Sequence, residues 1–163
     1  MKTVFVSGHM HVTDAEFEKY YQPQIDALLA AEGGTHFLVG DAPGFDTKVQ
    51  AVLADSGAKV TVYHMKAAAR NNVGDFETVG GFETAEARDE AMTQASDEDL
   101  AWVRPGRESS GVGANVQRRK KLAKLAGKPE ADDDENAAYN KAWSGDDDED
   151  GDDDEGEPAG EDE

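Results

Sequence analysis

A glycine-rich segment in the second half of the chain has the composition of an anion-binding turn. Residues 109–115 read SSGVGAN and follow a short apolar run at residues 100–103. A turn of this kind at the carboxyl end of a strand points bare backbone N–H groups at the space above the sheet, where phosphates bind. The segment therefore predicts a phosphate-binding turn, with nucleotides as the expected ligand class.

Two further segments place small residues beside hydroxyl or carboxylate groups at the ends of apolar runs. Ser7-Gly8-His9 follows the first run, and residues 40–46 (GDAPGFD) follow the second. One such segment alone is explained equally well as a simple turn, but three at one edge of a sheet favour a binding crevice. The residues predicted to face the ligand are Ser7, Gly8, His9, Gly40, Asp41, Asp46, Arg88, Ser109, Ser110, Gly111, Gly113 and Asn115.

Arg88 has two interpretations. Its planar guanidinium group suits bidentate contact with a phosphate or carboxylate. The alternative is a surface arginine paired along its own helix, which needs an acidic residue three or four positions away. Those positions hold Thr84, Ala85, Ala91 and Met92, so a ligand role is favoured, and Asp46 or Asp97 are candidates for pairing in space.

Metal ligands are few in this sequence. His9 and His11 are two residues apart with Asp14 nearby, but lining of the crevice or plain solvent exposure explains them better than a metal does. Asp41 and Asp46 fit either an Mg²⁺ ion that accompanies a phosphate, or turn formation and helix capping. The absence of cysteine excludes disulfides, thiolate chemistry and zinc–sulfur sites.

Apolar runs alternate with segments of helical periodicity, the pattern of parallel βαβ units. Strands are expected at residues 3–6, 37–39, 60–63 and 100–103. We predict an α/β fold over residues 1–129, a Rossmann-like three-layer sandwich with about four parallel strands in the order 3-2-1-4.

Helices are expected from Thr13 or Asp14 to Gly33, and at residues 45–55, 84–94 and 113–125. Pro23 lies inside the first of these patterns and either kinks that helix or splits it in two. Residues 66–83 interrupt the alternation. A connector of this length is expected to be a lid, a binding loop or a disordered segment.

The net charge of −20 is concentrated at one end of the chain. Residues 130–163 hold 18 of the 36 acidic residues and one base, a net charge of −17, whereas residues 1–129 carry −3. The acidic segment is too polar to form a packed core, so a disordered acidic tail is expected. A basic protein is the partner that would fit this tail.

Basic residues gather in the last predicted helix and just after it. Such a cluster either binds nucleic acid or stabilises the carboxyl end of a helix. The acidic tail would compete for it, so nucleic acid is not an expected partner while the tail is present. The cluster consists of Arg118, Arg119, Lys120, Lys121, Lys124 and Lys128.

No apolar run approaches the roughly 20 residues that a membrane span needs. The first strand follows directly on Met1 and Lys2, without the pattern of a signal peptide. A soluble, cytoplasmic protein without a membrane partner is therefore expected.

The order of these motifs resembles the SLOG superfamily, over residues 4–119. GDAPGFD at residues 40–46, R-D-x-x-M at 88–92, S-D at 96–97 and S-G-x-x-x-N at 110–115 are most similar to the YspA-like branch. More distant members include the DprA/Smf proteins and the "lonely guy" phosphoribohydrolases. The resemblance implies a Rossmann-like sheet that binds nucleotides or nucleotide-derived ligands, and some branches hydrolyse an N-glycosidic bond.

The hydrolytic relatives pair an arginine with a glutamate, and this sequence departs from that pattern. Arg88 matches the arginine, but either Asn115 or Gln117 stands at the glutamate position, depending on register. An amide cannot stabilise a developing oxocarbenium ion by charge or act as a general base. We therefore expect a ligand-binding protein. The alternatives are an N-glycosidase or ribosyl-transfer enzyme that uses another carboxylate, such as Asp46 or Glu83, and an interaction protein that acts through its tail.

Overall fold

The computed structural model describes residues 1–127, and the acidic tail predicted for residues 130–163 lies outside this range. Strands and helices alternate along the described chain as the apolar runs predict, with one strand more. The elements are β1 (Lys2–Ser7), α1 (Asp14–Tyr20), α2 (Gln22–Ala30), β2 (Thr35–Gly40), α3 (Phe45–Ser56), β3 (Lys59–Met65), β4 (Glu77–Phe82), α4 (Ala85–Ala95), β5 (Glu98–Ala101) and α5 (Gly111–Leu125).

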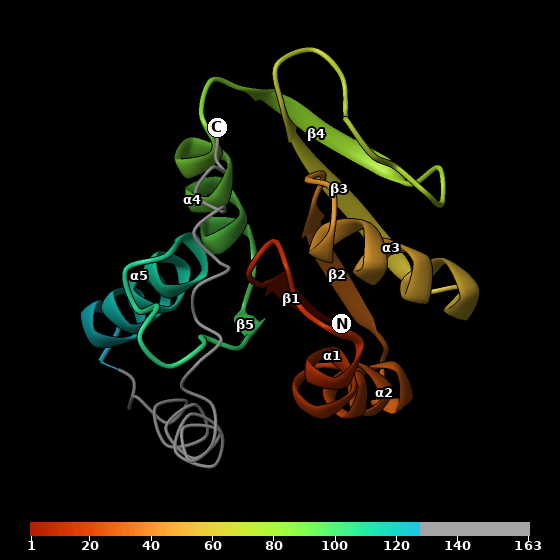
Figure 1. Ribbon diagram of the computed structural model, residues 1–163, viewed down its shortest axis with the longest axis horizontal. Helices are drawn as coiled ribbons and strands as arrows, with labels where there is room; N and C mark the ends of the chain where they lie inside the picture. The colour runs from red at the N-terminus through yellow and green to blue at the C-terminus, as the bar shows by residue number, and fades with distance from the viewer. Residues whose placement is uncertain (128–163) are drawn as a thin grey trace.

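The five strands form one parallel sheet in the order β4-β3-β2-β1-β5 (Figure 1). The expected order is confirmed for the four strands that the sequence predicts, namely β3, β2, β1 and β5. The expected number of strands is wrong, because β4 forms inside residues 66–83, where the sequence predicts a connector. β4 lies at the edge of the sheet, and its side chains are mostly exposed, so it lacks the apolar pattern that identifies the other strands.

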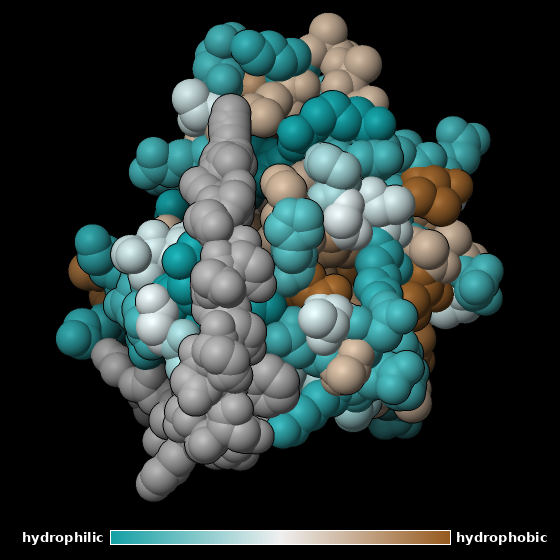
Figure 2. Space-filling view, viewed as in Figure 1, coloured by the Kyte–Doolittle hydropathy of each residue, from teal (hydrophilic) through white to brown (hydrophobic). Residues whose placement is uncertain are grey.

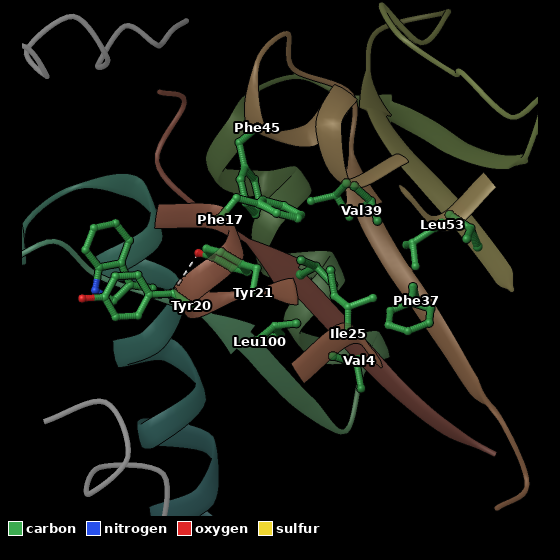
Figure 3. Close-up of a cluster of buried hydrophobic side chains, with 14 of the residues drawn as sticks. Val4, Phe17, Tyr20, Tyr21, Ile25, Phe37, Val39, Phe45, Leu53 and Leu100 are labelled. Atoms are coloured by element: carbon green, nitrogen blue, oxygen red, sulfur yellow. Dashed lines mark hydrogen bonds between the residues drawn. The ribbon is translucent and has the colours of Figure 1, made fainter. Parts of the chain in front are cut away.

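Helices cover both faces of the sheet, which gives three layers. The helices α1, α2 and α3 pack on one face, and α4 and α5 lie on the other (Figure 1). The larger hydrophobic cluster fills the first interface and includes Val4, Phe37 and Ile25 (Figure 3). Phe5 and Leu38 point to the opposite face, where they pack in a smaller cluster with Met92 of α4 and Tyr63. This alternation is the period-two pattern of strands buried on both faces.

The first helical segment is split in two, one of the two outcomes that Pro23 allows. A capping box opens α1, in which the Glu16 N–H donates to Thr13 Oγ1 at 3.1 Å and the Thr13 N–H donates to Glu16 Oε1 at 3.0 Å. Pro23 lies in the first turn of α2, where its missing N–H costs no intrahelical hydrogen bond. Tyr21 falls between the two helices, and its side chain enters the core.

The Tyr21 hydroxyl ties together the carboxyl ends of two neighbouring strands. It donates to the Ser7 carbonyl at 2.8 Å and accepts the Trp102 N–H at 2.9 Å. Burial raises the pKa of Tyr21, so the hydroxyl keeps the proton that it donates. These bonds fix the end of β1 relative to the chain that leaves β5. β5 itself ends at Ala101, earlier than the apolar run predicts, although Trp102 and Val103 are buried.

The described surface is mainly hydrophilic on the face seen in Figure 2, where hydrophobic residues form small separate patches. Exposed large hydrophobic side chains in residues 1–127 are Met1, Val73, Val79 and Leu125. Within the same range, no helix is both long and apolar enough to cross a membrane.

Candidate functional site

A cavity of about 480 Å³ opens at the carboxyl ends of the strands. The segments after β1, β2 and β3, the start of α4 and the turn before α5 form its wall, which is the expected place for a ligand in an open parallel sheet. Most residues predicted to face a ligand line this cavity: Ser7, Gly8, His9, Gly40, Asp46, Arg88, Ser109, Ser110, Gly111 and Asn115.

The amino end of α5 forms one wall of the cavity. Ser110 caps the helix, and its hydroxyl accepts the Gly113 N–H at 3.2 Å. Gly111 and Val112 also line the cavity, and their N–H groups have no acceptor in the described part of the chain. The first turn contains no acidic residue. Together with the helix dipole, these free donors make the wall attractive to an anion.

Ser7 adds an unsatisfied polar group to the wall of the same cavity. It lies at the end of β1, is 7% exposed, and its Oγ has no hydrogen-bond partner among residues 1–127. A buried hydroxyl without a partner costs roughly 1–3 kcal/mol. A bound ligand with a polar group at this position would remove that cost.

Arg88 is buried among carboxylates. Its side chain donates from Nη1 to Asp41 Oδ1 at 3.1 Å and from Nε to Asp89 Oδ1 at 3.1 Å. Its Nη2 lies 3.0 Å from the same Asp89 oxygen. Arg88 thus has no acidic partner three or four residues away on α4. It is paired instead with Asp89, the next residue along the chain, and with Asp41 from the turn after β2. Arg88 organises the cavity wall, and any contact with a ligand would use its remaining donors.

Asp41 lies outside the cavity wall and serves the fold. It is fully buried, and it accepts bonds from the Arg70 backbone N–H at 2.8 Å and from the Arg70 side chain at 2.9 and 3.2 Å. Burial tends to raise the pKa of Asp41, but the bonds from Arg70 and the charge of Arg88 outweigh it and hold the pKa below its ordinary value. Its oxygens are thus committed to two arginines rather than to a ligand or Mg²⁺.

Asp46 is the carboxylate of this group without a salt bridge among the described residues. Its Oδ2 accepts the Ala42 N–H at 3.1 Å, and the residue lines the cavity. Burial raises the pKa of Asp46 to about 6, although the charge of Arg88 opposes the shift. The Asp46 carboxylate also explains Gly40, because a Cβ at that position would lie 2.6 Å from Oδ2.

His9 is a neutral wall residue. Its Nε2 accepts the Arg104 N–H at 2.9 Å, and its ring packs edge-on against Trp102. Burial, followed by the charges of Arg104 and Arg107, lowers the pKa of His9 to about 3. Within residues 1–127 no group of three or more histidine, cysteine, aspartate or glutamate side chains is placed to hold a metal ion.

Two of the predicted glycines have packing roles. Gly113 does not line the cavity, because it packs against the backbone of Glu108, whose carbonyl oxygen would clash with a Cβ. Gly8 does line the cavity, but a Cβ there would lie 2.8 Å from the Tyr21 hydroxyl and 2.9 Å from the Phe45 ring. Gly111 differs from both, since a Cβ at that position would meet no atom within 4 Å.

Asn115 lies beside a carboxylate from another helix. Its Nδ2 donates to Asp89 Oδ2 at 3.3 Å, and its Oδ1 accepts from Arg118 Nη1 at 2.6 Å. The sequence analysis misses Asp89, which follows Arg88 on α4 and lines the cavity. A carboxylate therefore lies beside Asn115 in the cavity wall, although residue 115 is itself an amide.

Other residues that line the cavity are also not among those predicted from the sequence. Arg70 lies in residues 66–83 and lines the cavity while it holds Asp41, and Arg107 precedes the α5 turn. Met10 follows β1 and Met65 is the last residue of β3, and neither has a chemical signature. Their positions at the carboxyl ends of strands are the available sequence signal for the two methionines, and Arg70 lacks even that signal.

The basic cluster of α5 is partly committed to the fold. Arg119 donates to Asp99 Oδ1 at 2.9 and 3.2 Å and to Ser96 Oγ at 2.5 Å, and Arg118 bonds Asn115. Lys128 lies outside the described residues. These bonds favour a structural role for the two arginines over a free nucleic-acid surface.

Comparisons with protein-family models, with curated proteins and with solved structures find no match to this chain. The class of protein therefore rests on the fold itself. It is an α/β protein with a five-stranded parallel sheet of Rossmann-like arrangement, and its cavity lies at the carboxyl ends of the strands.

Proposed function

We propose that the protein binds a nucleotide or a nucleotide-derived ligand in this cavity. The observation that carries the proposal is the junction of an open helix N-terminus at Gly111 and Val112 with the unpartnered Ser7 hydroxyl, both at the carboxyl edge of one sheet. The resemblance of the turn motifs to the SLOG superfamily also supports the proposal.

The size and polarity of the cavity also favour a nucleotide. A volume of about 480 Å³ lies within the range of roughly 300–1,000 Å³ that is typical of small-molecule sites. The α5 end suits a phosphate, whereas the Asp89 carboxylate on another wall suits the hydroxyl groups of a ribose. A ligand with an anionic end and a sugar would match both.

Calorimetric titration against nucleoside mono- and diphosphates tests the proposal. Wild-type protein should bind at least one of them, and Ser7→Ala should weaken binding by roughly fivefold or more, since it removes one hydrogen bond of about 1 kcal/mol. Ser56→Ala is the matched control, because the Ser56 hydroxyl bonds within its own helix end, away from the cavity. Absence of binding across the panel would overturn the proposal.

A second candidate is an enzyme that cleaves the N-glycosidic bond of a nucleoside phosphate. The observation that favours it is the presence of two carboxylates, Asp46 and Asp89, in the cavity wall. In such a reaction the C1′–N bond breaks, a water oxygen bonds to C1′, and the released proton goes to the leaving base. Incubation of wild-type protein with nucleoside monophosphates should then release free base, and Asp89→Asn should abolish the release.

A further inference from the structure

Three carboxylates and two guanidinium groups meet beside the cavity. Asp41 is bonded by Arg70 and Arg88, and Asp89 is bonded by Arg88. Asp46 accepts one hydrogen bond among the described residues, from the neutral Ala42 N–H. The cluster therefore has one more negative charge than positive charges when all its groups are ionised, and we assign the excess to Asp46, the carboxylate without a salt bridge among the described residues.

This excess charge opposes the anion that the rest of the cavity attracts. An anionic group between the α5 end and Arg88 would lie in the same confined space as the Asp46 carboxylate, where like charges repel strongly. A proton on Asp46 would bring the cluster to neutrality, and it would also turn the carboxyl group into a hydrogen-bond donor. The other charged or titratable groups near this space are His9 after β1, Asp41 after β2, Arg70 after β3, Arg88 and Asp89 on α4, and Arg107 before α5.

We propose that Asp46 binds the anionic group of the ligand as a neutral carboxylic acid, so that each bound anion is taken up together with a proton. This inference rests on the proposed function and adds that the site is regulated by pH. Asp46 is suited to the role by its place: Oδ2 accepts the Ala42 N–H, and the residue lines the cavity without a salt bridge among the described residues. The other two carboxylates do not compete for the role, because Asp41 is bonded by Arg70 and Arg88, and Asp89 is bonded by Arg88.

Because the pKa of Asp46 is raised, protonation of Asp46 near neutral pH costs little free energy. Because that pKa is about 6 in the free protein, roughly one molecule in ten carries the proton at pH 7. A nearby anion raises the pKa further. Affinity for the anion should therefore increase as the pH falls from about 8 towards about 6, and it should level off below that point.

Sulfate is the appropriate probe, because its charge is constant over this pH range. We expect wild-type protein to bind sulfate roughly fiftyfold more tightly at about pH 5.5 than at about pH 8 in calorimetric titrations. Asp46→Asn keeps an acceptor for the Ala42 N–H and removes the charge. The variant should bind roughly fiftyfold more tightly than wild type at pH 8, and its affinity should change less than about twofold between the two pH values.

Asp55→Asn is the matched control, since it makes the same charge change at an exposed position of the same helix. It should retain the wild-type pH dependence. In buffers of different ionisation enthalpy at about pH 7, wild type should take up close to one proton per sulfate and Asp46→Asn close to none.

The outcomes separate this inference from the proposed function. Equal sulfate affinity and equal pH dependence in wild type and Asp46→Asn would overturn the proton-linked role while anion binding stands. If neither protein binds sulfate or a nucleotide at either pH, the proposed function fails and the inference fails with it. Thermal unfolding of each variant at both pH values verifies that the proteins compared are folded.

Discussion

Two strand-to-helix turns lie at the carboxyl edge of the sheet. They differ in whether the protein itself supplies partners for the first turn of the helix that follows. The turn at residues 40–46 opens α3, and there the protein supplies its own partners. The Phe45 N–H donates to the Met10 carbonyl at 3.1 Å, and Asp46 brings a carboxylate into the first turn. The turn that precedes α5 leaves the corresponding positions free, with no acid in the first turn.

Both turns contain glycine next to serine or aspartate, but the glycines are needed for different physical reasons. Gly40 makes room for the Asp46 carboxylate, so it serves the protein's own packing. At Gly111 no protein atom lies within 4 Å of where a Cβ would stand, so packing does not require a glycine there. A glycine-rich turn is therefore a candidate ligand site when the protein places no acidic group at the helix start.

The largest effect on stability is expected when Arg88, the cation bonded to Asp41 of the turn at residues 40–46, is removed. Arg88→Ala would leave Asp41 and Asp89 buried without their charge partner, and removal of one member of a buried pair costs about 3–5 kcal/mol. Arg70→Ala is the control, because its side chain is 46% exposed and Asp41 keeps Arg88. Urea denaturation should show a loss of stability several times larger for Arg88→Ala, and near-equal losses would contradict the role given to Arg88.

Gly111 and Gly113, both at the start of α5, allow a second comparison. Gly113→Ala should destabilise the fold by roughly 1–3 kcal/mol, because its Cβ would clash with the Glu108 backbone. Gly111→Ala should change stability by less than about 0.5 kcal/mol, since its Cβ would meet open space at the cavity. Thermal unfolding measures both. A large loss for Gly111→Ala would mean that this glycine serves the fold and not a ligand.

Asp46 allows a smaller, pH-dependent test of the first turn. Its pKa in the folded protein, about 6, lies above the ordinary value of 3.8. The folded state therefore binds the proton more tightly than the unfolded chain does, and Asp46 lowers stability progressively as the pH rises from about 4 to about 6. Asp46→Asn should be more stable than wild type by roughly 1–2 kcal/mol at pH 8 and equally stable below pH 4. Denaturation at a series of pH values would contradict this if the difference were independent of pH.

The fold is largely predictable from the sequence, and the unpredicted parts have physical explanations. β1, β2 and β3 are identified because both their faces are buried, which gives mainly apolar runs such as residues 60–63. β5 is identified by the apolar run at residues 100–103, of which Leu100, Trp102 and Val103 are buried. β4 is exposed at the sheet edge and contains Gly80 and Gly81, so no apolar period marks it. The split at Pro23 is signalled by the absent N–H, but the choice between kink and split depends on tertiary packing.

The candidate site is predictable in position and less so in residue roles. The carboxyl edge follows from the parallel topology, which explains why Ser7, Ser110 and Gly111 are found at the cavity. The roles of Asp41 and Asp89 depend on which side chains meet across the sheet. Sequence spacing along one helix carries no information on such contacts, so the pairing of Arg88 with these acids is visible only in the structure.

The smallest expected effect concerns the tail, whose residues 130–163 carry a net charge of −17. Deletion of this segment should raise the affinity of the open turn for an anion by a fewfold at low salt, because the long-range repulsion is removed. It should also strengthen any binding of DNA or RNA by the basic residues of α5. Titrations at low and at about 1 M salt should show the gain vanish at high salt, and a gain that persists would contradict an electrostatic cause.

The distinction between the two turns is tested most directly by amide NMR spectra recorded during a sulfate titration. The structure predicts that the N–H signals of Gly111 and Val112 shift most, since these donors are free at the cavity. The signal of Phe45 should shift little, because its N–H is already bonded to Met10. Shifts centred on the turn at residues 40–46, or a spectrum that sulfate leaves unchanged, would contradict the assignment of the α5 turn as the anion-binding end of the site.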